Sequence, residues 1–179
     1  MRRLLRADLL LPLVIVAAAL ALAASDLMAT FELTPPGREP IDEQLGGDRH
    51  GYAMLLLGAF TLVTLTIAVA TGQRAPAWAT AGLGIAALVL FLIVDLPDAG
   101  DTGEIEIEGI GLAGVEVVAQ PGFWLGAAAA LTLALAGIAY ASQSAEDRTA
   151  PRRLWAARRS SSSRRSDPSS SRDRRTDRA

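Results

Sequence analysis

The sequence predicts an all-α membrane protein: a bundle of four transmembrane helices with a small extracytoplasmic β-hairpin and a disordered basic C-terminal tail. Two features of the composition carry this prediction. Hydrophobic residues make up 51% of the 179 residues although 20% are charged, so the charges must be separated from the apolar segments. They leave four apolar runs of about 20 residues, the length of a helix that crosses the hydrocarbon core of a bilayer.

The predicted membrane domain covers residues 1–142, with helices at 9–29, 51–71, 77–96 and 122–142 and outer loops at 30–50 and 97–121. Pro76 and Pro121 each precede an apolar run, where a missing N–H group costs nothing, and Pro97 ends the third run. Aromatic side chains suit the headgroup region, and five lie near the predicted helix ends: Tyr52, Phe123 and Trp124 on one side, Trp78 and Tyr140 on the other.

The first helix has an alternative interpretation as a signal peptide. Arg2, Arg3 and Arg6 precede the apolar run, and the small residues from Ala21 to Ser25 resemble a cleavage site. The run is longer than the core of most signal peptides and continues past Asp26, so we expect a retained helix. Cleavage would leave three helices in the same orientation.

The distribution of arginine predicts the orientation. Residues 26–50 carry six acids against two arginines and residues 95–121 carry seven acids and no arginine, whereas the tail from Ser144 carries 11 arginines against five acids. Because basic segments stay in the cytoplasm, both termini are expected there and both acidic loops outside. Arginine without any lysine, beside abundant Ala and Gly, indicates a bacterial source, so the expected location is the inner, cytoplasmic membrane.

The two outer loops differ in pattern. In residues 104–108 isoleucine alternates with glutamate, and Val115, Val117 and Ala119 also stand at every second position, with a glycine-rich stretch between the two segments. This alternation predicts a β-hairpin with one apolar face. Residues 30–50 are rich in Pro, Gly and charge, so we expect irregular structure there.

Small residues at four-residue spacing predict how the helices pack. Membrane helices associate through close approach of small side chains, because leucine packs as well on lipid as on leucine. The fourth helix carries such a stripe, and the first carries a shorter one: Gly122, Gly126, Ala130 and Ala134, and Ala17 and Ala21. We expect packing inside one bundle; seams between copies of the chain are the alternative.

Candidate chemistry is sparse. The chain has no cysteine and a single histidine, so thiol chemistry is excluded and a zinc site or catalytic triad is not expected. Four ionisable residues near the outer helix ends form a candidate polar cluster for a cation, a substrate or a protonation switch: Asp26, Arg49, His50 and Asp95. The simpler interpretation is interfacial charge that pairs or is solvated. We expect no enzyme activity, cofactor or metal.

The predicted tail, residues 143–179, is dominated by Arg and Ser and has too few apolar residues for a core. Its first part is expected to contact anionic lipid headgroups through four arginines and a tryptophan: Arg152, Arg153, Trp155, Arg158 and Arg159. Nucleic acid is not expected as a partner, because the lipid headgroups are the nearer polyanion.

The segments DRHGYAMLLLGAF, VDLPDAG and QPGFWLGAAAA resemble small four-helix bacterial integral membrane proteins of uncharacterised function, a resemblance of layout over residues 9–142. It implies four spans in an inner membrane and carries no site residue. The function that we expect is a non-enzymatic accessory or interaction component, whose partners are the lipid bilayer and other membrane proteins or further copies of the chain. The alternative is a small transporter or channel subunit that works as an oligomer, with Thr61 and Thr64 lining a shared path.

Overall fold

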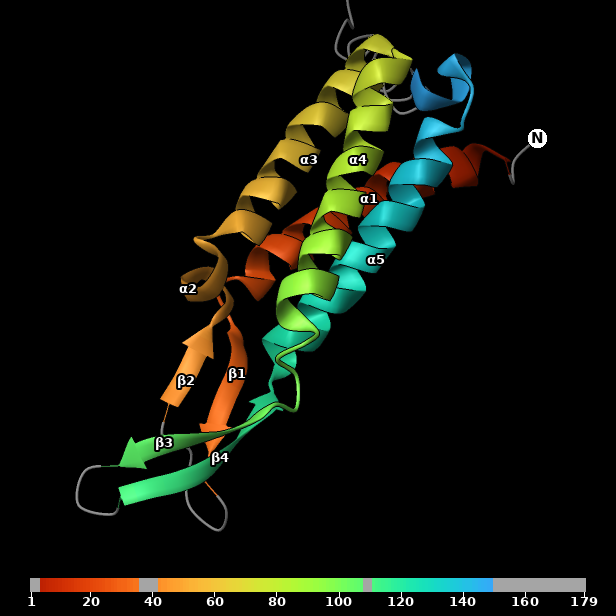
Figure 1. Ribbon diagram of the computed structural model, residues 1–179. Coiled ribbons are helices and arrows are strands. Elements are labelled where there is room, and N and C mark those ends of the chain that lie inside the picture. The colour runs from red at the N-terminus through yellow and green to blue at the C-terminus, as the bar shows by residue number, and fades with distance from the viewer. Residues whose placement is uncertain (1–3, 36–41, 108–110, 150–179) are drawn as a thin grey trace, which may run out of the picture.

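The computed structural model of the protein describes residues 4–35, 42–107 and 111–149. Within these residues, long helices lie side by side and a small β-sheet extends from one end of them (Figure 1). We call this the sheet end and the opposite one the tail end. The helix and strand labels are those of Figure 1.

The long helices are α1 (Leu4–Ser25), α3 (Ala53–Thr71), α4 (Arg74–Leu90) and α5 (Pro121–Ala141). Helix α4 continues into one π-helical turn, η1 (Phe91–Asp95). Helices α1 and α4 each pack against both α3 and α5, which gives a closed ring in the order α1, α3, α4, α5. Three helices, α3, α4 with η1, and α5, are long and apolar enough to cross a membrane; the apolar part of α1 is shorter, Leu9–Ser25.

Helix α1 ends earlier than the sequence pattern predicts. We expected residue 29 as its last residue, but the chain turns after Ser25, and Ala29 already begins a strand. The N–H groups of Leu27 and Met28 donate to the carbonyls of Ala24 and Ser25, as in a turn that closes a helix. Hydropathy alone missed this end, because Leu27 and Met28 prolong the apolar run across Asp26.

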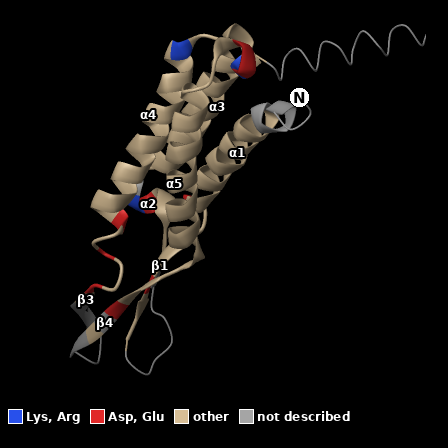
Figure 2. Ribbon diagram, turned by 90° about the vertical axis from the view of Figure 1, so that its right-hand side faces the viewer, with Lys and Arg blue, Asp and Glu red and all other residues tan. Residues whose placement is uncertain are grey.

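The outward surfaces of the helices are apolar. Leu13 on α1, Phe60 on α3, Ile93 on η1 and Leu135 on α5 are each between 57% and 68% exposed. A helix of a water-soluble bundle carries polar side chains at such positions. Figure 2 shows the charged residues gathered toward the two ends of the molecule, with the helices almost free of them in between.

The predicted aromatic belt is only partly present. Tyr52, Trp78 and Trp124 are exposed near helix ends, as expected for side chains at a headgroup region. Phe123 and Tyr140 are instead buried, at 3% and 0% exposure, so their assignment to the belt is wrong. Both pack in the core, where a hydrophobic ring stabilises the helix contacts.

The sheet has four antiparallel strands in the order β2-β1-β4-β3. The predicted hairpin is present as β3 (Thr102–Ile107) and β4 (Gly111–Ala119). We expected irregular structure in the other outer loop, and this prediction is wrong. The loop contains β1 (Ala29–Thr34), β2 (Asp42–Leu45) and the short helix α2 (Gly46–His50). Strand β1 pairs with β4, far along the chain, so its local sequence gave little sign of a strand.

The predicted disorder of the tail from residue 143 is wrong for its first part. Residues 145–149 are helical, and Arg148 is fully buried. Residues 150–179 lie outside the described part of the chain, and with them all five residues predicted to contact lipid.

Candidate functional site

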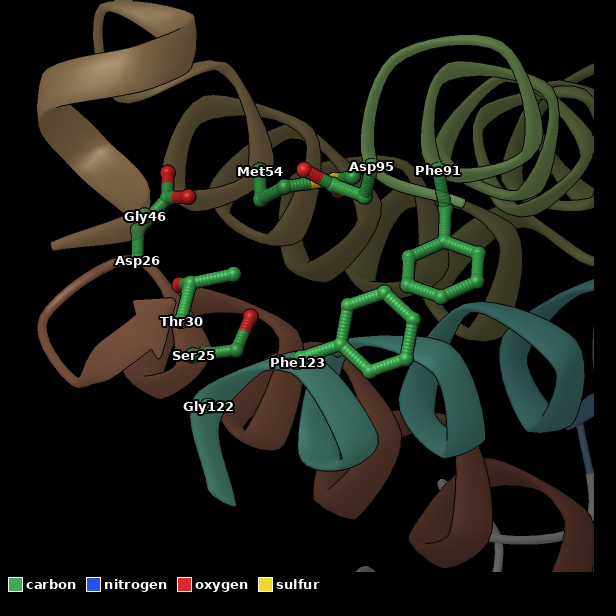
Figure 3. Close-up of a pocket in the computed structure, with 10 residues that line it drawn as sticks. Ser25, Asp26, Thr30, Gly46, Met54, Phe91, Asp95, Gly122 and Phe123 are labelled. Carbon is green, nitrogen blue, oxygen red and sulfur yellow. The ribbon is translucent and has the colours of Figure 1, made fainter. Parts of the chain in front are cut away.

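The strongest candidate site is a small polar cavity at the sheet end of the bundle, which we call the outer cavity. It forms where the end of α1, the start of α3, η1, the start of α5 and β1 meet (Figure 3). Its volume is about 10 Å³, roughly enough for one water molecule. Its polar wall consists of Ser25, Asp26, Thr30 and Asp95, and its apolar wall includes Met54, Phe91 and Phe123.

Asp26 connects the outer cavity to the start of α3. Its carboxylate Oδ2 accepts a hydrogen bond of 2.8 Å from the backbone N–H of Leu55, in the first turn of α3. The residue before that helix, Tyr52, has a left-handed backbone (φ 62°), and its side chain makes no capping hydrogen bond. Asp26, directly after the end of α1, thus supplies the acceptor that α3 lacks locally.

Asp95 reaches the outer cavity from the π-helical turn. It is the last residue of η1 and is only 3% exposed. A π-helical turn carries one extra residue, which changes the direction of the side chains after it and is frequent at functional sites. In Figure 3 the Asp95 side chain points from η1 toward Met54, and the rings of Phe91 and Phe123 lie together, with centroids 4.9 Å apart.

The predicted polar cluster is only partly brought together. Asp26 and Asp95 share the outer cavity, as that interpretation required. Arg49 instead forms an ion pair with Asp98, and its guanidinium lies 4.6 Å from the centroid of the Phe31 ring. His50 ends helix α2, and its side chain is outside what the structure describes.

The outer cavity offers polar side chains around a space for about one water molecule. The buried carboxyl groups of Asp26 and Asp95 line the cavity together with the hydroxyls of Ser25 and Thr30. The Ser25 hydroxyl donates to the Leu22 carbonyl at 2.7 Å. A space for about one water is too small for a metabolite. Among the described residues, no group of three or more His, Cys, Asp or Glu side chains is arranged to hold a metal ion.

The predicted packing stripes fall into two groups. Gly122, Gly126, Ala130 and Ala134 are all buried on α5. A Cβ atom on Gly122 would lie 2.4 Å from the Ala29 carbonyl oxygen, and one on Gly126 would lie 3.3 Å from the Ser25 hydroxyl. On α1 the contacts are made by a different face, because Ala17 is exposed and Ala21 is only half-buried, while Ala18 and Ala19 are buried.

Three further glycines allow close contacts between helices, and sequence analysis missed them. A Cβ atom on Gly58 would lie 2.6 Å from the Ala19 carbonyl oxygen, which brings α3 against α1. On Gly84 it would lie 2.7 Å from the backbone nitrogen of Ala134, and on Gly137 2.8 Å from the Cα of Ala81. Gly84 and Gly137 therefore allow close approach of α4 and α5. Gly137 lies three residues after the predicted stripe, so a search at spacing three as well as four would have found it.

The threonines of α3 serve helix structure and helix contact. Thr61 is fully buried, and its hydroxyl donates to the Leu57 carbonyl at 2.8 Å, as expected for a threonine inside a helix. The Thr64 hydroxyl shares a hydrogen bond of 3.0 Å with the hydroxyl of Thr80 on α4. Interhelical hydrogen bonds of this kind stabilise helix association in membranes.

Arg148, which sequence analysis also missed, closes the tail end of the bundle. Its guanidinium donates to the carbonyls of Gly72, at 3.1 Å, of Ala141, at 3.4 Å, and of Gln143. These carbonyls follow or end α3 and α5, where backbone acceptors have no intrahelical partner. The Ser144 hydroxyl accepts from the N–H of Asp147, and this hydrogen bond caps the start of the helical turn that carries Arg148. A serine followed three residues later by an acidic residue is a pattern of helix starts, and it could have predicted this helical turn from the sequence.

Comparison with models of protein families, with curated proteins and with solved structures finds no match for this chain.

Proposed function

We propose that the chain is a non-enzymatic protein of the cytoplasmic membrane, that its four helices cross the bilayer, and that it acts as an interaction component through its outer sheet. The observation that carries the proposal is the apolar outer surface of the bundle, on which side chains such as Leu13, Phe60 and Ile93 are more than half exposed. Burying them in lipid contributes about 25 cal/mol per Å² of apolar surface removed from water.

The proposed orientation places the sheet outside and both termini in the cytoplasm. It is supported by the charge asymmetry: residues 95–121 carry seven acids and no arginine, while the tail carries 11 arginines. The outer cavity then lies between the bundle and the external sheet. Asp26, which lines this cavity, connects the end of α1 to the start of α3.

Cysteine labelling in cells tests this orientation, because the native chain has no cysteine. Asp101→Cys and Glu116→Cys change exposed residues at the sheet end, and Gln73→Cys and Glu146→Cys change exposed residues at the tail end. A membrane-impermeant maleimide should label the first pair in intact spheroplasts and the second pair only after permeabilisation. The unmodified protein gives the background. Labelling of the tail-end pair alone, or recovery of the protein in the soluble fraction, would overturn the proposal.

We also infer that α1 is retained rather than cleaved as a signal peptide. Ile15, Ala19 and Leu22 are fully buried, and Asp26 caps α3, so removal of the segment up to Ser25 would expose the faces that α3 and α5 pack against it. The mass of the intact protein purified from membranes tests this inference, since cleavage would remove about the mass of α1.

Contact between the tail and anionic lipid belongs to the same proposal. Arg148 holds the chain against the tail end of the bundle only four residues before Arg152. We expect the arginines that follow to contact the inner leaflet, where each contributes about 1 kcal/mol of attraction to an anionic surface. A peptide of residues 150–162 should bind vesicles that contain anionic lipid and dissociate as salt is raised. Salt-insensitive binding to neutral vesicles would contradict this account.

A further inference from the structure

A groove between α1 and α5 opens on the outer surface of the bundle, and we call it the α1–α5 groove. Its volume is about 290 Å³, and no charged residue of the described chain lines it. Small side chains form most of its walls. The main lining residues are Val14, Ala17 and Ala21 on α1, and Leu125, Ala128 and Thr132 on α5. Because Ala17, Ala128 and Thr132 are exposed, the groove faces the surroundings of the bundle.

The groove gives the small-residue stripe of α1 a position on the outside of the bundle. We expected Ala17 and Ala21 to pack inside it, but the buried alanines there are Ala18 and Ala19. Ala17 and Ala21 instead line the groove. Membrane helices approach one another closely where the facing side chains are small. Small side chains alone also accommodate a lipid chain, so the occupant must be identified from the polar group in the groove.

Thr132 is that polar group, and it differs from the other threonines of the described helices. The six others donate from the hydroxyl to the carbonyl one turn back, as is usual in a helix: Thr61, Thr64, Thr66, Thr71, Thr80 and Thr149. The Thr132 hydroxyl has no hydrogen-bond partner within the described residues. Exposure does not explain the difference, because Thr66 is also exposed and its hydroxyl donates to Leu62 at 2.7 Å.

Thr132 lies at a depth where few partners are available. It is residue 12 of the 21 in α5, so the proposed crossing of the bilayer places it near the middle of the hydrocarbon. A polar group without a hydrogen bond is unfavourable there, because lipid tails neither donate nor accept. A lipid chain would fill the groove and leave the hydroxyl unpaired. A second helix with a hydroxyl at the same depth would fill the groove and pair with it.

The bundle already contains a contact of this kind. The hydroxyls of Thr64 and Thr80 share a hydrogen bond of 3.0 Å between α3 and α4. Two copies of the chain inserted in the same orientation carry Thr132 at the same depth, so a twofold axis normal to the membrane brings the two hydroxyls together. The uncharged lining of the groove lets the two copies meet without repulsion between like charges.

We propose that the α1–α5 groove is the interface of a symmetric dimer, in which the Thr132 hydroxyls of the two copies share one hydrogen bond. The small residues of the groove let the helices approach closely. Leu135, one turn after Thr132 and 61% exposed, is available to fill the groove of the other copy. This inference rests on the proposed function, because the hydroxyl lacks water as an alternative partner only inside a membrane.

Disulfide cross-linking in native membranes tests the interface, since the native chain has no cysteine. Ala128→Cys places a thiol in the groove, and a membrane-permeant oxidant should convert this variant largely to a covalent dimer. The matched control is Phe60→Cys on α3, the helix diagonally across the ring from α5. Both positions are exposed, and each is residue 8 of its helix counted from the sheet end.

The Phe60→Cys protein should form little dimer. Equal cross-linking of the two variants would indicate random collision and would overturn the proposal. A product in which Ala128→Cys is joined to a different protein would show that the occupant of the groove is not a second copy.

Variants of the hydroxyl test the hydrogen bond. Energy transfer between full-length proteins labelled at Glu146→Cys, measured in vesicles at decreasing protein density, gives the dissociation constant of the dimer. Thr132→Val keeps the shape and removes the hydroxyl, so it should raise this constant about three- to tenfold, the usual range for an interhelical hydrogen bond. Thr132→Ser should restore the affinity. The control Thr66→Val removes an exposed hydroxyl that already has a partner and should have no effect. Equal effects of Thr132→Val and Thr66→Val would contradict the role of Thr132.

A larger side chain in the groove tests the close approach. Ala128→Leu should weaken the dimer more than Thr132→Val, whereas Ala86→Leu, at an exposed alanine of α4, should leave it unchanged. Recovery of the protein in the soluble fraction would overturn both the proposed function and the dimer. A protein that stays in the membrane but is monomeric at every density would overturn the dimer alone.

Discussion

The two ends of the helix bundle are closed by buried polar side chains of opposite kind, an aspartate at one end and an arginine at the other. At the sheet end, Asp26 accepts from a backbone N–H in the first turn of α3. At the tail end, Arg148 donates to carbonyls at the ends of α3 and α5. Each side chain supplies what the helix end lacks, an acceptor at an N-terminus and donors at the C-termini. A bundle with an apolar exterior can therefore complete its helix ends with single polar side chains.

The ends differ in how much surrounds that side chain. Asp26 lines the outer cavity, and the same end of the bundle also carries α2 and the four strands of the sheet. Arg148 is carried by one helical turn after α5 and binds three carbonyls by itself. We therefore expect stability to be distributed over many contacts at the sheet end and concentrated in one residue at the tail end.

The largest expected effect follows from removing that residue. Arg148→Ala leaves the carbonyls of Gly72, Ala141 and Gln143 without their donor. A hydrogen bond to a charged group contributes roughly 1.5–3 kcal/mol, and water at the membrane surface replaces part of the loss, so we expect about 3 kcal/mol lower unfolding free energy. Urea unfolding in detergent micelles, followed by circular dichroism, measures it.

The control for this variant is Arg74→Ala, which removes an exposed arginine at the same end of the bundle and should change the unfolding free energy little. Arg148→Lys keeps the charge but cannot serve three carbonyls with one planar group, so it should recover only part of the stability. Equal stability of the Arg148→Ala and Arg74→Ala proteins would show that the tail end does not depend on the guanidinium.

Between the two ends, the close approach of α4 and α5 gives the next largest effect. Gly84→Leu places a side chain where even a Cβ atom would lie 2.7 Å from the Ala134 backbone nitrogen, and overpacking of this kind costs about 1–3 kcal/mol. Gly82→Leu on the same helix is the matched control, because a Cβ atom there meets nothing within 4 Å. Helix propensity favours leucine over glycine at both positions, so an equal loss in both variants would show that the contact at Gly84 does not account for the change.

Much of the helical part of the fold could be predicted from the sequence. The boundaries of α3 and α5 differ by at most two residues from the predicted ones, because charge and proline mark the ends of apolar runs. The sheet could be predicted only where pairing is local, as in the hairpin of β3 and β4. Strand β1 depends on β4, which lies about 80 residues away, and no pattern within residues 30–50 indicates such a partner.

In the candidate site too, features that depend on local sequence could be predicted, and contacts between distant segments could not. Asp26 and Asp95 could be selected because each is an isolated charge at the end of an apolar run, and both line the outer cavity. The role of Asp26 as a cap of α3 was not predictable, since Leu55 is 29 residues away and the contact depends on how the helices pack. Arg148 was assigned to a disordered tail because composition averages over a segment and hides one buried residue.

The sheet end should respond less to loss of its buried charge. Asp26→Ala removes the acceptor of the Leu55 N–H, and loss of a helix cap costs about 0.5–2 kcal/mol. Asp26→Asn keeps an oxygen at the same place, so it should retain more than half of that stability in the same urea experiment. An Asp26→Ala loss larger than that of Arg148→Ala would reverse the comparison between the ends.

The smallest effect is expected at the ion pair of Arg49 with Asp98 at the sheet end. The Asp98 side chain is 43% exposed, and ion pairs that reach solvent contribute about 0.2–1 kcal/mol, so Asp98→Asn should lower stability by about 0.5 kcal/mol. Arg49→Ala should cost more, because Arg49 also covers the ring of Phe31 at 4.6 Å. Raising salt should reduce the effect of Asp98→Asn and leave most of the Arg49→Ala effect. If salt abolished both effects equally, Arg49 would act by charge alone, and the packing of the sheet on the bundle would depend only on its apolar face.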